Sequence, residues 1–171
     1  MFKRFSAILL LLISSMSVYA QDKKKDEEPP YLKYPELPAF NILLMDSSSV
    51  FNTFNIPTGR YTVIMHFDPD CKHCKATMAE LTAHMDSLQN IDFYLATPSK
   101  EYRFIRTFYS DYKLGSFANI KAVGCDYALF FMDYYQVHAF PDVALYGPDK
   151  KIIKLFDGHI TVQELYDYSH K

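Results

Sequence analysis

Apolar and polar residues follow one another in blocks of strand and helix length from about residue 39 onward. Five apolar runs have the length of strands: 61–67, 91–97, 120–123, 142–146 and 152–156. Apolar residues recur at helical spacing in four stretches: 71–89, 99–112, 127–135 and 161–168. Two further apolar runs, 40–45 and 50–54, flank the polar turn 46–49 and predict a hairpin at the edge of a sheet. This order predicts an α/β protein that ends in an antiparallel strand pair and a helix.

Polar residues stand where several of these helices should begin. Ser99 is the expected N-cap of the helix in 99–112, and Asp126 is the expected cap of the helix in 127–135. Thr161 and Glu164 have the spacing of a capping box for the last helix. Each of these signals fixes where a helix should start.

Two segments at the beginning of the chain differ from the globular part. In residues 1–20, Lys3 and Arg4 precede an apolar run, and the segment ends on the small residue Ala20, which is typical of a cleaved secretory signal peptide. An uncleaved membrane anchor is the alternative, although the apolar run is short for a span. Residues 21–38 are charged and then proline-rich, which favours a disordered linker. Residues 39–171 suffice for one domain with its own core.

Charge and cysteine content narrow the classes of function. Without Lys3 and Arg4, 16 basic residues remain against 20 acidic ones, a net charge of −4. A nucleic-acid-binding domain would be expected to carry a basic face, so this class is disfavoured. An exported chain enters an oxidising compartment, yet it has only three cysteines, and two of them are too close to link distant segments. The cysteines therefore indicate a reactive site rather than structural disulfide bonds.

Cys71 and Cys74 stand directly after the apolar run 61–67 and at the beginning of the helical stretch 71–89. A helix N-terminus stabilises a thiolate, which is the reactive form of cysteine, so this placement predicts a thiol–disulfide site. Lys72 and His73 lie between the two cysteines and should lower the pKa of Cys71, whereas the neighbouring Asp70 should raise it. A midrange redox potential follows from these opposing effects.

Two other interpretations of the cysteines stay open. Cys71, His73 and Cys74 could bind zinc together with His66 or His84, although ligands so close on one helix point in different directions. Cys125 is the third cysteine and has no sequence partner. It is either a small buried core residue or a thiol that pairs with another chain.

At this point the chain resembles the thioredoxin fold, and within it the secreted TlpA/ResA-like (redoxin) branch. The residues that carry the resemblance are Cys71–Cys74 after a strand, Phe140–Pro141 before the penultimate strand, Gly158 after the last strand and the hairpin 40–54. The resemblance covers about residues 39–170. It implies a thioredoxin-like α/β domain, with a central mixed β-sheet flanked by helices and an added N-terminal β-hairpin.

Several positions depart from the pattern of that family. The family has Trp directly before the first cysteine, where this chain has Asp70. Thioredoxins have a buried Asp at the position of Met65, and the secreted branch often has Glu at the position of Thr77. A helix-kinking Pro is replaced by Ala79. The acids that usually handle protons in the family are therefore missing at their usual positions.

The resemblance also implies roles for individual residues. Cys71 is expected to be the nucleophile and Cys74 the resolving thiol, and together they would form the redox-active Cys71–Cys74 disulfide. Pro141 matches the cis-proline of the family, and the backbone of Phe140 would bind an extended substrate segment. No cofactor and no metal are implied.

The function that follows is an exported thiol–disulfide oxidoreductase, periplasmic in a bacterium, that acts on protein disulfides and is served by a redox partner. Reduction is the commonest task of the branch, and His73 favours an oxidase or isomerase instead. A thiol peroxidase is disfavoured because the strand end lacks the Pro-x-x-x-Thr-x-x-Cys approach to the cysteine. A non-catalytic adaptor that binds partners at Phe140–Pro141 is the alternative from another class. We expect no stable membrane insertion once the signal is cleaved.

Overall fold

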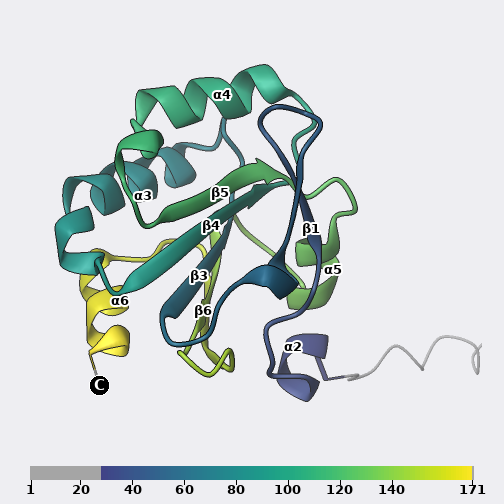
Figure 1. The fold of residues 1–171 in the computed structure, drawn as a ribbon, viewed down its shortest axis with the longest axis vertical. Coiled ribbons are helices and arrows are strands. Elements are labelled where there is room, and N and C mark those ends of the chain that lie inside the picture. The colour runs from purple at the N-terminus through teal and green to yellow at the C-terminus, as the bar shows by residue number, and fades with distance from the viewer. Residues whose placement is uncertain (1–27, 171) are drawn as a thin grey trace, which may run out of the picture.

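The computed structural model describes residues 28–170, so the expected signal peptide 1–20 lies outside the described residues. Seven strands form one mixed sheet in the order β2-β1-β5-β4-β3-β6-β7 (Figure 1). The strands are β1 (Asn41–Leu44), β2 (Val50–Asn52), β3 (Tyr61–His66), β4 (Ile91–Thr97), β5 (Ile120–Cys125), β6 (Asp142–Tyr146) and β7 (Ile152–Asp157). Strands β3, β4 and β5 are parallel to one another, and the remaining pairs are antiparallel. The expected α/β architecture with a central mixed sheet is confirmed.

Helices cover both faces of this sheet. They are α2 (Pro30–Lys33), α3 (Lys72–Ala83), α4 (Tyr102–Asp111), α5 (Phe130–Tyr135) and α6 (Val162–Ser169). Buried side chains of α3, α4 and α6 share one apolar cluster with Val63, Leu95 and Leu145 of the sheet. Buried side chains of α5 share a second cluster with residues on the opposite face, and Tyr31 of α2 packs against it. Figure 1 shows α3 and α6 on one side of the sheet and α2 and α5 on the other.

The predicted N-terminal hairpin is present and lengthens the sheet beyond β5. Ile42 of β1 is fully buried, and Leu43 and Leu44 pair with Cys125 and Gly124 of β5. A Cβ atom on Gly124 would collide with the carbonyl oxygen of Leu43. The close approach of β1 to β5 therefore requires a glycine at this position.

The structure places more of the expected linker on the domain than its composition suggests. Residues 30–33 form α2, and the Tyr134 hydroxyl donates to the carbonyl of Tyr34 at 2.6 Å. The amide of Leu37 donates to Lys150, and the amide of Ile152 donates to Pro35. From residue 30 onward this segment is therefore part of the folded unit, because its backbone pairs with the turn and strand at 150–152.

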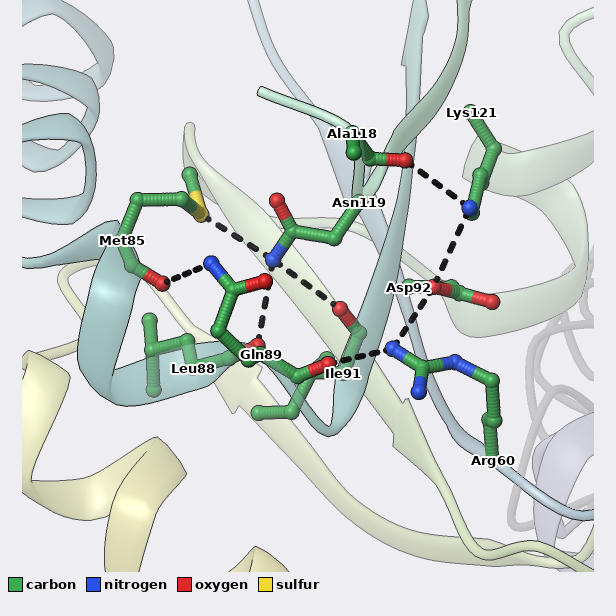
Figure 2. Close-up of polar contacts among 9 residues, drawn as sticks. All are labelled: Arg60, Met85, Leu88, Gln89, Ile91, Asp92, Ala118, Asn119 and Lys121. Carbon is green, nitrogen blue, oxygen red and sulfur yellow. Dashed lines mark hydrogen bonds and ion pairs between the residues drawn. The ribbon is translucent and has the colours of Figure 1, made fainter.

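A polar network lies where β4 begins, at the end of the sheet that is remote from the cysteines. The buried side-chain amide of Asn119 lies within hydrogen-bonding distance of the carbonyls of Leu88 and Ile91, at 3.1 and 3.2 Å. Arg60 lies 3.0 Å and Lys121 3.6 Å from the carboxylate of Asp92, as Figure 2 shows. This network joins the loop before β3, the start of β4 and the loop before β5.

The helix caps agree only in part with the sequence. Thr161 and Glu164 form the predicted capping box of α6. Helix α4 begins two residues later than the Ser99 cap would place it, and the Ser99 hydroxyl instead accepts from the amide of Glu101 at 3.3 Å. Asp126 does accept from a helix amide, that of Phe131, but α5 starts only after Leu129, which has a left-handed conformation. This turn conformation shortens the helix.

Candidate active site

Cys71 and Cys74 lie at the beginning of α3, just after the loop that connects β3 to this helix. Cys71 occupies the N-cap position of α3 and is partly exposed, whereas Cys74 lies one turn further and is fully buried. Both are free thiols in this structure. The amide of Lys75 donates to the Cys71 carbonyl and closes the first turn of the helix. The pair thus consists of an outer sulfur that a substrate can reach and an inner sulfur that it cannot.

Burial raises the pKa of Cys74 to about 12. The nearby Cys71 and Asp68 raise this pKa further, while the backbone amide of Asp68, which donates to Cys74 Sγ at 3.4 Å, acts in the opposite direction. Cys74 is therefore a thiol at neutral pH and has to lose a proton before it can attack another sulfur.

The carbonyl of Phe140 faces the outer sulfur. Cys71 Sγ donates to Phe140 O at 3.7 Å, although the two residues are 69 positions apart in sequence. The peptide bond between Phe140 and Pro141 is cis, and Pro141 is buried. The segment that precedes β6 therefore offers its backbone beside Cys71.

Lys72 and His73 are exposed on the first turn of α3. Neither side chain has a hydrogen bond or an ion pair with another described residue, so their expected influence on Cys71 stays a prediction. The structure adds a contact that the sequence did not suggest. Lys75 Nζ lies 3.2 Å from the Asp70 carboxylate, so the anion next to Cys71 has a cation of its own.

The residues of the zinc alternative do not meet. His66 is fully buried, and its ring stacks on Phe131 of α5, on the face of the sheet opposite to Cys74. His84 is exposed and caps the C-terminal end of α3, roughly 16 Å along the helix from His73 at 1.5 Å per residue. No group of three or more His, Cys, Asp or Glu side chains in residues 28–170 is arranged to hold a metal ion.

Two buried titratable residues lie beneath the Phe140 segment, in a pairing that the sequence did not predict. His66 at the end of β3 and Asp142 at the beginning of β6 are partners in the sheet register. Burial lowers the pKa of His66 to about 3, and neither of its ring nitrogens has a hydrogen-bond partner among the described residues. Burial, with a smaller contribution from Asp157, raises the pKa of Asp142 to about 7. A sequence signal existed only for His66, as a polar residue in an apolar run.

Cys125 lies apart from the pair. It is buried at the end of β5, two strands away from β3, and its partners in the sheet are Leu43 and Thr97. Burial raises the pKa of its thiol. These surroundings are those of a small core residue.

Solved structures share the architecture of this chain. StoA from Bacillus subtilis matches it with a TM-score of 0.60 at 15% identity, over 80% of this chain and 100% of StoA. A secreted Mycobacterium tuberculosis disulfide oxidoreductase homologous to E. coli DsbE matches with a TM-score of 0.62 at 17% identity, over 76% of this chain and 93% of that one. The thioredoxin domain of a Bacteroides vulgatus thiol-disulfide oxidoreductase matches with a TM-score of 0.56 at 13% identity, over 83% and 95%.

Comparisons of sequence add no further relative. No protein-family model matches the chain, and no curated protein matches it. At these levels of identity the structural likeness shows the fold, and what each of the three proteins does is said of that protein alone.

Proposed function

The chain has a thioredoxin-like fold, and from that premise we propose that it is an exported thiol–disulfide oxidoreductase that reduces disulfides of other proteins. The observation that carries the proposal is the placement of the two sulfurs. Cys71 is accessible at a helix N-terminus, Cys74 is buried behind it, and the Phe140 carbonyl faces Cys71. An accessible sulfur backed by a buried one is the arrangement that a two-step exchange requires.

In the first step the Cys71 thiolate attacks one sulfur of the substrate disulfide. A bond forms between Cys71 and that sulfur, the substrate S–S bond breaks, and the leaving thiolate takes up a proton. In the second step Cys74 loses its proton and attacks Cys71 Sγ, which releases the second substrate thiolate. The substrate has then gained two electrons, and the protein holds a Cys71–Cys74 disulfide that a dithiol protein partner must reduce.

The segment before β6 supports a role in substrate binding. An extended substrate strand could pair with the backbone of Phe140, which already lies within hydrogen-bond reach of Cys71. This contact would align the substrate sulfur with Cys71. The roles of Phe140 and Pro141 are proposed on this ground.

The opposite direction of exchange is the second candidate. The exposed His73 directly before Cys74 is the feature that favours an oxidase or isomerase, because a protonated imidazole beside Cys71 would stabilise the reduced form. An adaptor without catalysis would use the same Phe140 segment and would need neither sulfur. The measurements below separate these functions.

Export is proposed from the sequence of residues 1–20, and periplasmic localisation would follow in a bacterium. Within the described part of the chain, every helix is too short or too polar to cross a membrane.

An insulin-reduction assay with dithiothreitol tests the proposed function. We expect the parent protein to accelerate insulin precipitation, and Cys71→Ser to abolish the acceleration. Cys74→Ser should instead trap mixed disulfides with partner proteins, because the second step is then missing. A parent protein without activity in this assay would contradict the proposal. The redox potential, obtained by equilibration with glutathione, decides between reductase and oxidase.

A further inference from the structure

A cavity of about 200 Å³ lies on the side of the sheet where Figure 1 shows α2 and α5. Its walls include Tyr31 of α2, Tyr135 at the end of α5 and parts of the paired strands β6 and β7. Asp142 of β6 and Asp157 of β7 are register partners, and both line the cavity. Among the described residues that line it there is no Lys or Arg. Two acidic residues therefore share this cavity without a basic one.

Asp142 is the member of this pair whose burial lacks compensation. Its side chain is almost completely buried, and Oδ1 has no hydrogen-bond partner among the described residues. Its neighbours in the sheet are His66 and Asp157. Burial lowers the pKa of His66 to about 3, so this residue supplies no positive charge near neutral pH. Because a buried carboxylate needs a partner charge, only a proton or a cation from elsewhere can stabilise Asp142.

The walls of the cavity favour an organic cation over a metal ion. No group of three or more His, Cys, Asp or Glu side chains within residues 28–170 is arranged to hold a metal ion. Beside the two carboxylates stand the rings of Tyr31 and Tyr135, whose centroids are 5.9 Å apart. Carboxylates and aromatic rings are the groups that bind guanidinium and ammonium ions in proteins. An arginine or lysine side chain therefore has the matching chemistry.

One loop connects this cavity with the cysteines. Gln136 and His138 line the cavity, and two residues after His138 the carbonyl of Phe140 lies 3.7 Å from Cys71 Sγ. His138 and Ala139 are exposed, so this stretch is open to a partner. An extended peptide advances about 3.3 Å per residue. A substrate that lies along the loop with its cysteine at Cys71 would therefore reach the cavity within a few residues.

We propose that the cavity is a specificity subsite that binds an arginine or lysine side chain of the protein substrate, close to the disulfide under attack. The cation pairs with Asp142 and Asp157 while the substrate cysteine meets Cys71. Asp142 then obtains the positive charge that Asp92 has from its own two cations. The role in substrate choice rests on the proposed function, whereas the affinity of the cavity for the cation does not.

An NMR titration of the isotope-labelled protein tests the affinity without any disulfide exchange. The probe is N-acetyl-arginine amide, and its neutral analogue N-acetyl-citrulline amide is the control. We expect the arginine compound to shift the amide signals of Gln136, His138, Asp142 and Asp157 in a saturable manner, and the citrulline compound to leave them in place. Equal shifts with both compounds, or none with either, would overturn the site.

The affinity for the arginine compound should depend on pH. Burial, with a smaller contribution from Asp157, raises the pKa of Asp142 to about 7, so this carboxyl has to lose a proton before it pairs with a cation. The affinity should rise about tenfold from about pH 6 to 8. The other titratable groups that face Asp142 are His66, Asp157, His138 and the two tyrosines of the cavity. A protonated His138 would also repel a cation, so His138→Gln should keep this pH dependence and Asp142→Asn should lose it. The opposite pattern would contradict the assignment.

The role in substrate choice is tested with short peptides whose cysteine carries thionitrobenzoate in a mixed disulfide. The Cys71 thiolate attacks the peptide sulfur, a bond forms between these two sulfurs, and thionitrobenzoate leaves as a coloured thiolate. Arginine or citrulline is placed at successive positions from the cysteine. At the favoured position the arginine peptide should react on the order of 10-fold faster. Failure of all peptides to react would contradict the proposed function, whereas equal rates at every position would overturn the subsite alone.

Variants locate the preference on the protein. Asp142→Asn and Asp157→Asn should each remove most of it, and Asp157 is exposed, so its variant keeps the test valid if Asp142→Asn folds poorly. Asp111→Asn is the matched control, because it removes the same charge from the exposed end of α4, a helix that packs on the other face of the sheet. Its preference should equal that of the parent. A loss as large as that of Asp157→Asn would mean that the acidic protein attracts cations only in general, and the subsite would be overturned.

A second source of a cation is the chain itself. Lys23–Lys25 lie outside the described residues and shortly before Pro29, which lines the cavity. A variant with serine at all three positions separates the two sources. It should show the same preference for the arginine peptide as the parent. A preference that appears only in this variant would mean that the chain occupies its own cavity, and the role in substrate choice would be overturned.

Discussion

Asp92 and Asp142 are both almost completely buried, and they lie beside opposite ends of the same strand. Asp92 is the register partner of Thr62 near the beginning of β3, and Asp142 is the partner of His66 at its end. Two cations, Arg60 and Lys121, surround the carboxylate of Asp92. At the other end of β3, no cation within residues 28–170 forms an ion pair with Asp142.

The two aspartates differ in how the burial of a carboxyl group is compensated. The cations beside Asp92 offset the loss of hydration of a carboxylate. Asp142 instead faces Asp157 across the β6–β7 pair, and its pKa of about 7 means that it binds a proton over most of the acidic range. The end of the sheet beside the cysteines thus retains buried titratable groups without charged partners. Such groups lower local stability, which is expected beside a functional site.

The largest effect concerns the pH dependence of stability. In the folded protein the pKa of His66 is lowered from 6.5 to about 3, so its contribution to stability is present above pH 6.5 and is lost as the pH falls. The pKa of Asp142 is raised from 3.8 to about 7, so its contribution is present below pH 3.8 and is lost as the pH rises. Between about pH 4 and 6.5 the two slopes oppose each other.

Asp142→Asn should expose the slope of His66. With the opposing slope of Asp142 removed, the contribution of His66 to the free energy of unfolding is expected to rise by about 1.4 kcal/mol per pH unit. Over the range from about pH 3 to 6.5 this amounts to roughly 5 kcal/mol. Urea unfolding at a series of pH values measures it. A profile parallel to that of the parent protein would mean that Asp142 is ionised in the folded state.

His66→Phe should expose the opposite slope. Phenylalanine can keep the stacking on Phe131 and Phe140, so the fold is preserved. The contribution of this pair to the free energy of unfolding should then fall by about 4 kcal/mol between pH 3.8 and about 7, because Asp142 is the member of the pair that still titrates. The same urea series measures it, and a stability that rises with pH in this variant would contradict the comparison.

At the opposite end of the sheet, Asn119→Ala should cost about 3 kcal/mol at any pH near neutrality. The variant leaves the buried carbonyls of Leu88 and Ile91 without the side-chain amide of Asn119. The urea midpoint measures the loss, and Asn55→Ala, at an exposed position, is the control. A loss below about 0.5 kcal/mol would show that water replaces the amide.

The smallest effect is expected for Arg60→Met. The Arg60 side chain is 43% exposed, and Lys121 still accompanies Asp92, so the loss should stay below about 1 kcal/mol. Salt should reduce it further, because the Debye length is only about 3 Å at 1 M. A loss as large as that of Asn119→Ala would mean that Asp92 depends on a single cation, and the contrast with Asp142 would narrow.

The sequence predicted the elements of the domain well because of how they are buried. Strands β3, β4 and β6 are covered on both faces, which produces uninterrupted apolar runs. The predicted start of α5 at residue 127 was wrong, because Leu129 adopts a left-handed conformation that no neighbouring residue indicates. The packing of α2 was missed because it depends on backbone contacts with the distant turn at 150–152.

For the candidate site, the sequence predicted the position of the two cysteines but not which distant residues surround them. Cys71 and Cys74 are near in sequence, so their spacing and the adjoining strand and helix predicted where they lie. Thr77 Oγ1 and His159 Nδ1 lie 3.2 Å apart only because the fold brings α3 beside the loop after β7, and each residue is unremarkable in its own segment. The same holds for His66 and Asp142, which are paired only by the register between β3 and β6.

The strand order has a consequence for how the protein behaves among other chains. Without the hairpin, the six-residue strand β5 would be an edge with free backbone groups, ready to pair with a strand of another molecule. The hairpin covers β5 and leaves as the new edge β2, which is only three residues long. At the other edge, Lys154 of β7 projects an exposed charge. The accessory hairpin thus protects the sheet against edge-to-edge aggregation, and Gly124 is the residue that lets it attach.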